Sequence, residues 1–98
     1  MYVKVHDGES GRVVAACDRE LVGKVLEEGD KFLDLDTYRN FYVGQISEGP
    51  ELKKHLSEFA SANLVGTKSV GIALGMGLAS EDDIMYINET PYIQIYKI

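Results

Sequence analysis

The chain begins with an alternation of apolar and polar residues. Across residues 2–6, Val3 and Val5 fall on one face of an extended chain and their neighbours on the other, which predicts a half-buried strand. Residues 7–11, Asp-Gly-Glu-Ser-Gly, are typical of a turn. Residues 12–17 are then almost continuously apolar, as expected of an inner strand covered on both faces. This pattern predicts an N-terminal hairpin.

The next part of the chain is less periodic. Asp18 is expected to cap a short helix over residues 19–23, because a carboxylate accepts the free N–H groups of a first helical turn. Residues 24–36 are extended in character and are broken by a turn at Glu28-Gly29-Asp30. Residues 41–46 are expected to form another short strand.

Helical spacing marks the middle of the chain. Pro50 suits the first position of a helix, and apolar residues then recur at helical spacing to a predicted end at Asn63. Residues 67–78 form a second predicted helix, apolar on two stripes and therefore expected to be buried on more than one side. Asn63 and Gly66 are expected at the joint between these helices, where a polar amide could also contact a ligand.

Three glycines, Gly71, Gly75 and Gly77, lie on the second predicted helix. Glycine costs about 1 kcal/mol relative to alanine inside a helix, so their presence needs a reason. The close approach of another backbone is the expected reason, and contact with a partner chain is the alternative.

The C-terminal part returns to strand character. Residues 80–83 match a capping-box pattern or form a turn after the helix. Residues 84–88 and 92–98 are rich in Ile and Tyr and are separated by Glu89-Thr90-Pro91, which predicts a C-terminal hairpin. We therefore predict one α+β domain over residues 1–98. It is a two-layer sandwich of a mostly antiparallel sheet, with hairpins at both ends and two main helices in the middle.

Composition narrows the class of protein. The chain has 98 residues, of which 45% are hydrophobic and 27% charged, so a disordered or fibrous class is excluded. Its single cysteine, Cys17, cannot form a bridge within the chain. The N-terminus has no signal-peptide pattern, and the nearly uncharged residues 64–79 fall short of the roughly 20 apolar residues of a membrane span. A cytoplasmic protein with no membrane contact is expected.

The formal net charge of −6 bears on partners. The ten basic residues are scattered, and only Lys53 and Lys54 are adjacent, so DNA binding is excluded and RNA binding by the chain alone is expected to be weak. Five acidic residues gather in the middle of the chain: Glu27, Glu28, Asp30, Asp34 and Asp36. A solvated acidic face, a basic docking partner and a Mg²⁺ or Ca²⁺ site are the alternatives for this segment.

The inventory of reactive residues is poor. Cys17 ends an inner strand, so its thiol is expected to be buried and inert. The glycines of residues 75–80 lack the last small position of a dinucleotide motif, and Gly23-Lys24 lacks the rest of a phosphate loop. We predict no catalytic residue, no metal ligand and no cofactor.

Six tyrosines form another feature of the sequence. Tyr92, Gln94 and Tyr96 share one face of the last predicted strand. Packing on a half-buried sheet or at the rim of an interface is expected for them, and stacking with RNA bases is the alternative.

A set of short motifs resembles one family over essentially the whole chain. They are Val13-Val14-Ala15 with Cys17-Asp18, Leu21 with Gly23-Lys24 and Glu28-Gly29, Phe41-Tyr42 with Gly44, Ala62-Asn63-Leu64-Val65-Gly66 with Ser69-Val70, Gly77-Leu78, and Pro91 with Gln94-Ile95. In this order they resemble the archaeal domain-of-unknown-function family 424. The resemblance implies a compact α+β domain of an archaeal cytoplasm and an RNA- or ribosome-associated accessory role. The family pattern places a histidine after its proline where this chain has Tyr92, so chemistry that depends on that histidine is not implied here.

These observations favour a non-catalytic binding or adaptor domain that acts through protein–protein contacts, including a homodimer through an apolar helix or strand edge. A translation-associated RNA-binding accessory protein is the alternative. A small enzyme would need a cleft that joins Asn63, Tyr92 or Gln94 to an acidic residue or to Cys17. The candidate interaction residues are Tyr42, Asn63, Gly66, Tyr92 and Gln94.

Overall fold

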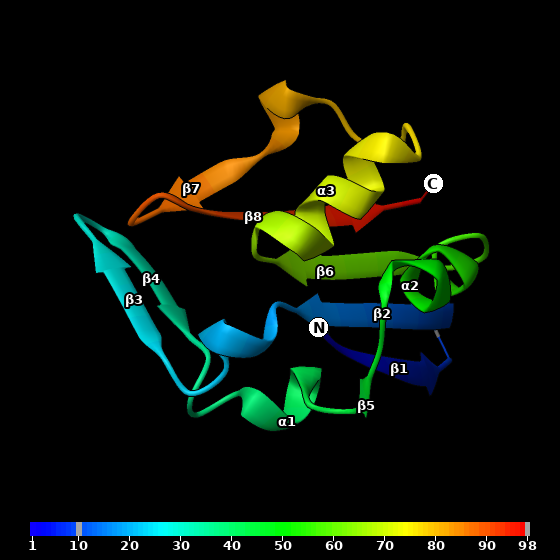
Figure 1. The fold of residues 1–98 in the computed structure, drawn as a ribbon, viewed down its shortest axis with the longest axis horizontal. Helices are drawn as coiled ribbons and strands as arrows, with labels where there is room; N and C mark the ends of the chain where they lie inside the picture. The colour runs from blue at the N-terminus through cyan, green and yellow to red at the C-terminus, as the bar shows by residue number, and fades with distance from the viewer. Residues whose placement is uncertain (10, 98) are drawn as a thin grey trace.

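A six-stranded sheet organises the computed structural model, which describes residues 1–9 and 11–97 (Figure 1). Its strands lie in the order β5-β1-β2-β6-β8-β7. Their bounds are Tyr2–Gly8 for β1, Gly11–Cys17 for β2, Gln45–Ile46 for β5, Ser61–Val65 for β6, Met85–Ile87 for β7 and Thr90–Tyr96 for β8. Every neighbouring pair is antiparallel except β2 and β6, which are parallel. The predicted mixed α+β class with a mostly antiparallel sheet is confirmed.

Both predicted hairpins are present, although Thr90 and Pro91, expected in the C-terminal turn, belong to β8. At the N-terminus, β1 pairs with β2 from Tyr2 opposite Cys17 to Gly8 opposite Gly11. At the C-terminus, Asn88 and Glu89 connect β7 to β8, and both have positive φ, 47° and 65°. Two successive residues in the left-handed region are typical of the tight turn whose twist matches that of paired strands.

Two helices cover one face of the sheet, α2 over Gly49–His55 and α3 over Thr67–Gly75 (Figure 1). Pro50 lies in the first turn of α2, as predicted, and Glu48 and Glu51 form a capping box there. The main core lies between these helices and the sheet. Its buried residues include Leu52, Leu56, Val70 and Ala73 from the helical side, and Val14, Ala16, Leu64 and Ile93 from the strands.

The first helix is shorter than predicted. It ends at His55, and residues 61–65, expected to contain its C-terminal end, form the central strand β6. Short apolar runs fit helix and strand periods alike. Pairing with β2 on one side and β8 on the other satisfies the backbone of this buried segment as a strand. The predicted joint between two helices is therefore wrong, because Asn63 lies inside β6 and Gly66 follows it.

Residues 41–46 also differ from the predicted strand. A short helix, α1 over Arg39–Tyr42, comes first and only Gln45–Ile46 are extended. The helical turn directs successive aromatic residues to different places. Tyr42 is buried in a second core, and Phe41 stacks on the ring of His6.

The segment from residue 19 to 34 follows the prediction more closely. A 3-10 helix, η1, spans Arg19–Leu21 and is shorter than expected. The strands β3 (Val25–Glu28) and β4 (Lys31–Asp34) then form a two-stranded hairpin outside the main sheet, turning at Gly29 and Asp30. The hairpin lies on the side of β7, to which it is tied by a hydrogen bond from Lys31 Nζ to the Tyr86 carbonyl (Figure 1).

The glycines of α3 are not sites of close backbone approach, contrary to expectation. A Cβ added to Gly71 or Gly75 would meet nothing within 4 Å, and both residues are exposed. Gly77, with φ of 73°, instead ends the helix, since its N–H donates to Leu74 and that of Leu78 donates to Ala73. The helix is buried on one side only, through Ser69, Val70 and Ala73.

After α3, a second 3-10 helix, η2, spans Glu81–Asp83 and has the capping box predicted between Ser80 and Asp83. Within the described parts of the chain, residues 1–9 and 11–97, no helix has the length and apolar character needed to span a bilayer.

Candidate functional site

Three of the candidate residues meet on the face of the sheet that α2 and α3 leave free. Asn63 of β6 lies directly opposite Gln94 of β8, and Val65 lies opposite Tyr92. Residues directly opposite in paired strands share a face, and residues two apart on one strand do too. Asn63, Tyr92 and Gln94 are thus brought together on what we call the second face of the sheet.

A second core covers one half of this face. Leu35 and Tyr42 are buried there against Ala15, Cys17 and Val65, and Tyr92 packs at the border. Burial raises the pKa of the Tyr42 hydroxyl to about 12, with a smaller effect from Cys17. The other half is more open, because Val13 and Asn63 are half-buried while Gln94 and Tyr96 are exposed.

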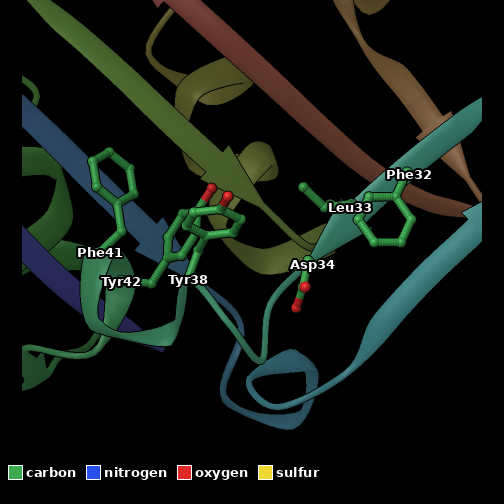
Figure 2. Close-up of a pocket in the computed structure, with 6 residues that line it drawn as sticks. All are labelled: Phe32, Leu33, Asp34, Tyr38, Phe41 and Tyr42. Carbon is green, nitrogen blue, oxygen red and sulfur yellow. The ribbon is translucent and has the colours of Figure 1, made fainter.

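A cavity of about 320 Å³ lies beside the second core, and we call it the aromatic pocket (Figure 2). It is lined by Phe32, Leu33, Asp34, Tyr38, Phe41 and Tyr42. Figure 2 shows Phe32 on the β3–β4 hairpin across from Tyr38 and Tyr42, whose hydroxyls point the same way. The hairpin and the region of α1 therefore form opposite walls of one hollow.

The Phe41 ring of the pocket is positioned by contacts with β1 as well as by its own helix, α1. The Phe41 ring stacks on that of His6, with centroids 4.7 Å apart, and meets the Tyr42 ring edge-on at 5.1 Å. The His6 Nε2 atom lies 2.9 Å from the Phe41 carbonyl oxygen. Through these contacts, β1 positions one wall of the pocket and joins it to the open half of the second face.

The one charged residue in the lining is Asp34. Its Oδ1 accepts the backbone N–H groups of Thr37, at 2.8 Å, and Asp36, at 3.0 Å. The Thr37 hydrogen bond is the main cause that lowers the pKa of this carboxyl, so the group is ionised at neutral pH. Figure 2 shows the carboxylate turned away from the rings, at the rim of the pocket.

The outward side of the hairpin continues this rim. Val25 lies opposite Asp34, and Glu27 lies opposite Phe32, so all four share the outer side. Phe32 is 61% exposed, and Tyr38 across the pocket is 64% exposed. Apolar and acidic side chains are thus mixed on one accessible surface.

Asp18 does not cap the helix at residues 19–21, as predicted, but caps α3. Its side chain makes no hydrogen bond to η1. Instead, its Oδ2 accepts the Lys68 N–H at 2.9 Å, and its Oδ1 accepts the N–H and hydroxyl of Ser69. Since β2 and β6 are parallel, their ends lie side by side, and Asp18 reaches the first turn of the helix that follows β6.

Gly66, another candidate interaction residue, is required next to this cap because a larger residue would collide with Asp18. Its φ is 106°, and a Cβ there would overlap the Asp18 carboxyl group. Its N–H donates to the Pro91 carbonyl at 2.8 Å. Gly66 thus permits close packing between the end of β6 and Asp18.

The Cys17 thiol is engaged within the fold. Burial is the main cause that raises the pKa of Cys17 to about 12, and its Sγ donates to the Asp18 carbonyl. The cavity beside Gln94 also contains Asp83 but measures only about 250 Å³, below the roughly 300 Å³ of ordinary ligand pockets. In the parts of the chain that the structure describes, no three His, Cys, Asp or Glu side chains converge as metal ligands.

Of the pocket residues, Tyr42 was a candidate interaction residue and Asp34 belonged to the acidic segment singled out in the sequence. Phe32, Tyr38 and Phe41 were missed. One signal was present, because Phe32 and Asp34 alternate with Leu33 in β4, which places an aromatic and an acidic side chain on the same outward side. That Tyr38 and Phe41 form the opposite wall follows only from the path of residues 35–42.

Comparison with known proteins identifies the family. A crystal structure of an uncharacterized conserved protein from Methanopyrus kandleri superposes with a TM-score of 0.77 and 25% sequence identity, covering 97% of this chain and 89% of that one. No curated protein matches the chain. The model of the family described as "Protein of unknown function (DUF424)" matches residues 5–98. The resemblance seen in the sequence motifs is therefore confirmed, and the chain belongs to the DUF424 family.

Proposed function

We propose that the chain is a non-catalytic cytoplasmic binding domain that contacts a partner protein through the aromatic pocket and the outer side of the β3–β4 hairpin. The exposure of Phe32 and Tyr38, on opposite walls of the pocket, carries the proposal. Large apolar rings gathered in water at the mouth of a hollow are typical of interaction sites. Aromatic side chains in central pockets supply much of the energy of protein interfaces.

The state of the nucleophilic groups supports a role without catalysis. Cys17 is fully buried and its thiol is protonated at neutral pH. The hydroxyl of Ser69 donates to Asp18 inside the fold, where it stabilises the start of α3. Neither group lines the aromatic pocket.

Affinity capture from a lysate of the source organism tests the proposal. We expect the tagged chain to retain a protein after nuclease treatment and to lose it in the double variant Phe32→Ala/Tyr38→Ala. Tyr96→Ala is the matched control, because Tyr96 is equally exposed but lies on β8. Capture that depends on nucleic acid, or that the double variant leaves unchanged, would contradict the proposal. Light scattering of the purified chain separates self-association from binding of a different protein.

An RNA-binding accessory role is the second candidate, and the open half of the second face favours it. Strand registers place Lys4, His6, Asn63, Gln94 and Tyr96 on that face, and none of its described strand residues is acidic. Tyrosine rings can stack on bases, and amides can bond to base edges.

The positions of the other cations make this candidate the weaker one. Arg39 pairs with Asp36, Lys97 lies over the Phe59 ring, and Lys53 is on α2, which covers the opposite face. Salt-dependent retention of tRNA or rRNA fragments that Tyr96→Ala reduces, and Phe32→Ala/Tyr38→Ala does not, would favour RNA.

A further inference from the structure

The outer side of the β3–β4 hairpin has a regular chemical pattern. In each of two successive outward-facing cross-strand pairs, one member is apolar and the other acidic: Val25 opposite Asp34, and Phe32 opposite Glu27. The two apolar residues lie on one diagonal and the two carboxylates on the other. An extended segment presents every second residue to one side, so the chemical complement of this pattern is a segment whose residues on that side, two apart in sequence, alternate between basic and apolar.

The aromatic pocket complements the same kind of segment. Lysine and arginine have long apolar stems and a cationic head, and they pack their stems on apolar surface. Aromatic rings also attract cations through their electron-rich faces. Four of the six lining residues are aromatic. Asp34 is the charged one, and its carboxylate lies at the rim.

The carboxylates near the pocket differ in what they already bind. Asp36 forms an ion pair with Arg39 at 2.5 Å. The described hydrogen bonds to Asp34 come from uncharged groups of Thr37 and Asp36, so its negative charge is not matched by a cation there. The Lys31 ammonium is directed to the Tyr86 carbonyl and does not line the pocket.

We propose that the aromatic pocket receives a lysine or arginine side chain from an extended basic segment of a partner protein, while apolar residues of that segment pack on Val25 and Phe32. This inference rests on the proposed function and names the chemistry of the partner. A second copy of the chain fits poorly, because its net charge of −6 would repel the acidic hairpin and its basic residues are scattered.

Amide NMR titration of the full chain tests the inference with defined probes. The first probe is a capped peptide in which lysine and valine alternate at every second position, with serine between them, so that both kinds of side chain share one face of the extended peptide. The others are the same peptide with glutamate at each lysine, the same peptide with serine there, spermine as a free cation, and a short single-stranded RNA. We expect the lysine peptide to shift amides of residues 25–42 and to bind at least about tenfold more tightly than each other probe, and to weaken as salt rises.

Single substitutions in the pocket and the hairpin test whether these residues bind the lysine peptide. Phe32→Ala and Tyr38→Ala should each weaken binding of the lysine peptide about three- to tenfold. Asp34→Asn keeps an oxygen that accepts the Thr37 and Asp36 N–H groups, and should weaken binding and reduce its salt dependence. Tyr96→Ala and Glu58→Gln are exposed controls outside this surface and should leave the affinity unchanged.

The outcomes separate this inference from the proposed function. If the serine or glutamate peptide shifts residues 25–42 as strongly as the lysine peptide, the basic partner is wrong while the pocket remains a protein-binding surface. Equal binding of spermine or RNA at these amides also overturns the inference. If no probe binds while lysate capture still depends on Phe32 and Tyr38, the inference fails and the proposed function stands.

Discussion

Asp18 and Ser69 form a buried pair that joins the end of one strand to the start of a helix. The Asp18 Oδ1 atom lies 2.9 Å from the Ser69 backbone nitrogen and 2.8 Å from its hydroxyl oxygen. Ser69 is fully buried and Asp18 is 2% exposed. With the Lys68 N–H on Oδ2, the carboxylate binds three donors. A residue of the β2 end thus provides the N-terminal cap that α3 lacks in its own sequence, where Gly66 precedes it.

Replacing Asp18 by alanine should strongly destabilise the fold. The change removes a helix cap, which contributes about 1 kcal/mol, and leaves buried donors unsatisfied at about 1–3 kcal/mol each. With the two buried Ser69 donors, we expect the free energy of unfolding, measured by urea denaturation, to fall by at least about 3 kcal/mol. Asp18→Asn keeps one acceptor oxygen and should lose less. A loss below about 0.5 kcal/mol for Asp18→Ala would show that the cap is not needed.

Two glycines on either side of the start of α3 should respond oppositely to alanine. Gly66→Ala places a Cβ against the Asp18 carboxyl group at a φ of 106°, so we expect a loss of several kcal/mol or failure to fold. Gly71→Ala meets nothing within 4 Å inside the helix. It should stabilise the chain by up to about 1 kcal/mol. Thermal denaturation of the two variants compares them, and equal effects would contradict the structure.

The aromatic residues of the pocket should separate into structural and accessible ones. Tyr42 is buried in the second core, so Tyr42→Ala should cost about 3 kcal/mol of unfolding free energy. Phe32→Ala and Tyr38→Ala should change it by less than about 1 kcal/mol, because both side chains are largely exposed. Chemical denaturation measures all three. Large losses in the exposed pair would mean that these rings serve folding rather than binding.

The stability of the chain should fall at alkaline pH because of Cys17. Its thiol has a pKa raised from 9.0 to about 12 in the folded state. Between these values the unfolded chain releases a proton that the folded chain keeps, so the free energy of unfolding decreases as pH rises, by up to about 1.4 kcal/mol per pH unit. Tyr42, with its pKa raised from 10.0 to about 12, adds to the decrease above pH 10.

Urea denaturation measures this effect against the Cys17→Ala variant. The measurements run from about pH 8, below the ordinary thiol pKa of 9.0, to about pH 10.5, which lies between that value and the folded value of about 12. Wild type should lose about 1–2 kcal/mol more than the variant over this interval. Parallel curves for the two proteins would show that the folded thiol ionises at its ordinary pKa.

Local pattern was enough to predict both terminal hairpins, and the extended chain with a turn that forms β3 and β4. In each case turn residues such as Asp7-Gly8 or Gly29-Asp30 separate short runs of strand-forming residues, and pairing needs only neighbours in the chain. The candidate site could be predicted only in part. Asn63, Tyr92 and Gln94 do share a face, but the aromatic pocket needs residues 32 and 38–42 to meet across a hollow.

The sequence by itself determined the α+β class, the terminal hairpins, the place of Pro50 in the first turn of α2 and the family, because these depend on short-range periodicity, turn chemistry and motif order. Tertiary structure alone decided that residues 61–65 form a strand between β2 and β8, that Asp18 caps α3, and that Phe32 faces Tyr38. Each of these depends on backbone pairing or side-chain contact between segments distant along the chain. A short stretch of sequence contains no information on the free energy of such contacts. Once the core has formed, this free energy outweighs the local propensity of the residues.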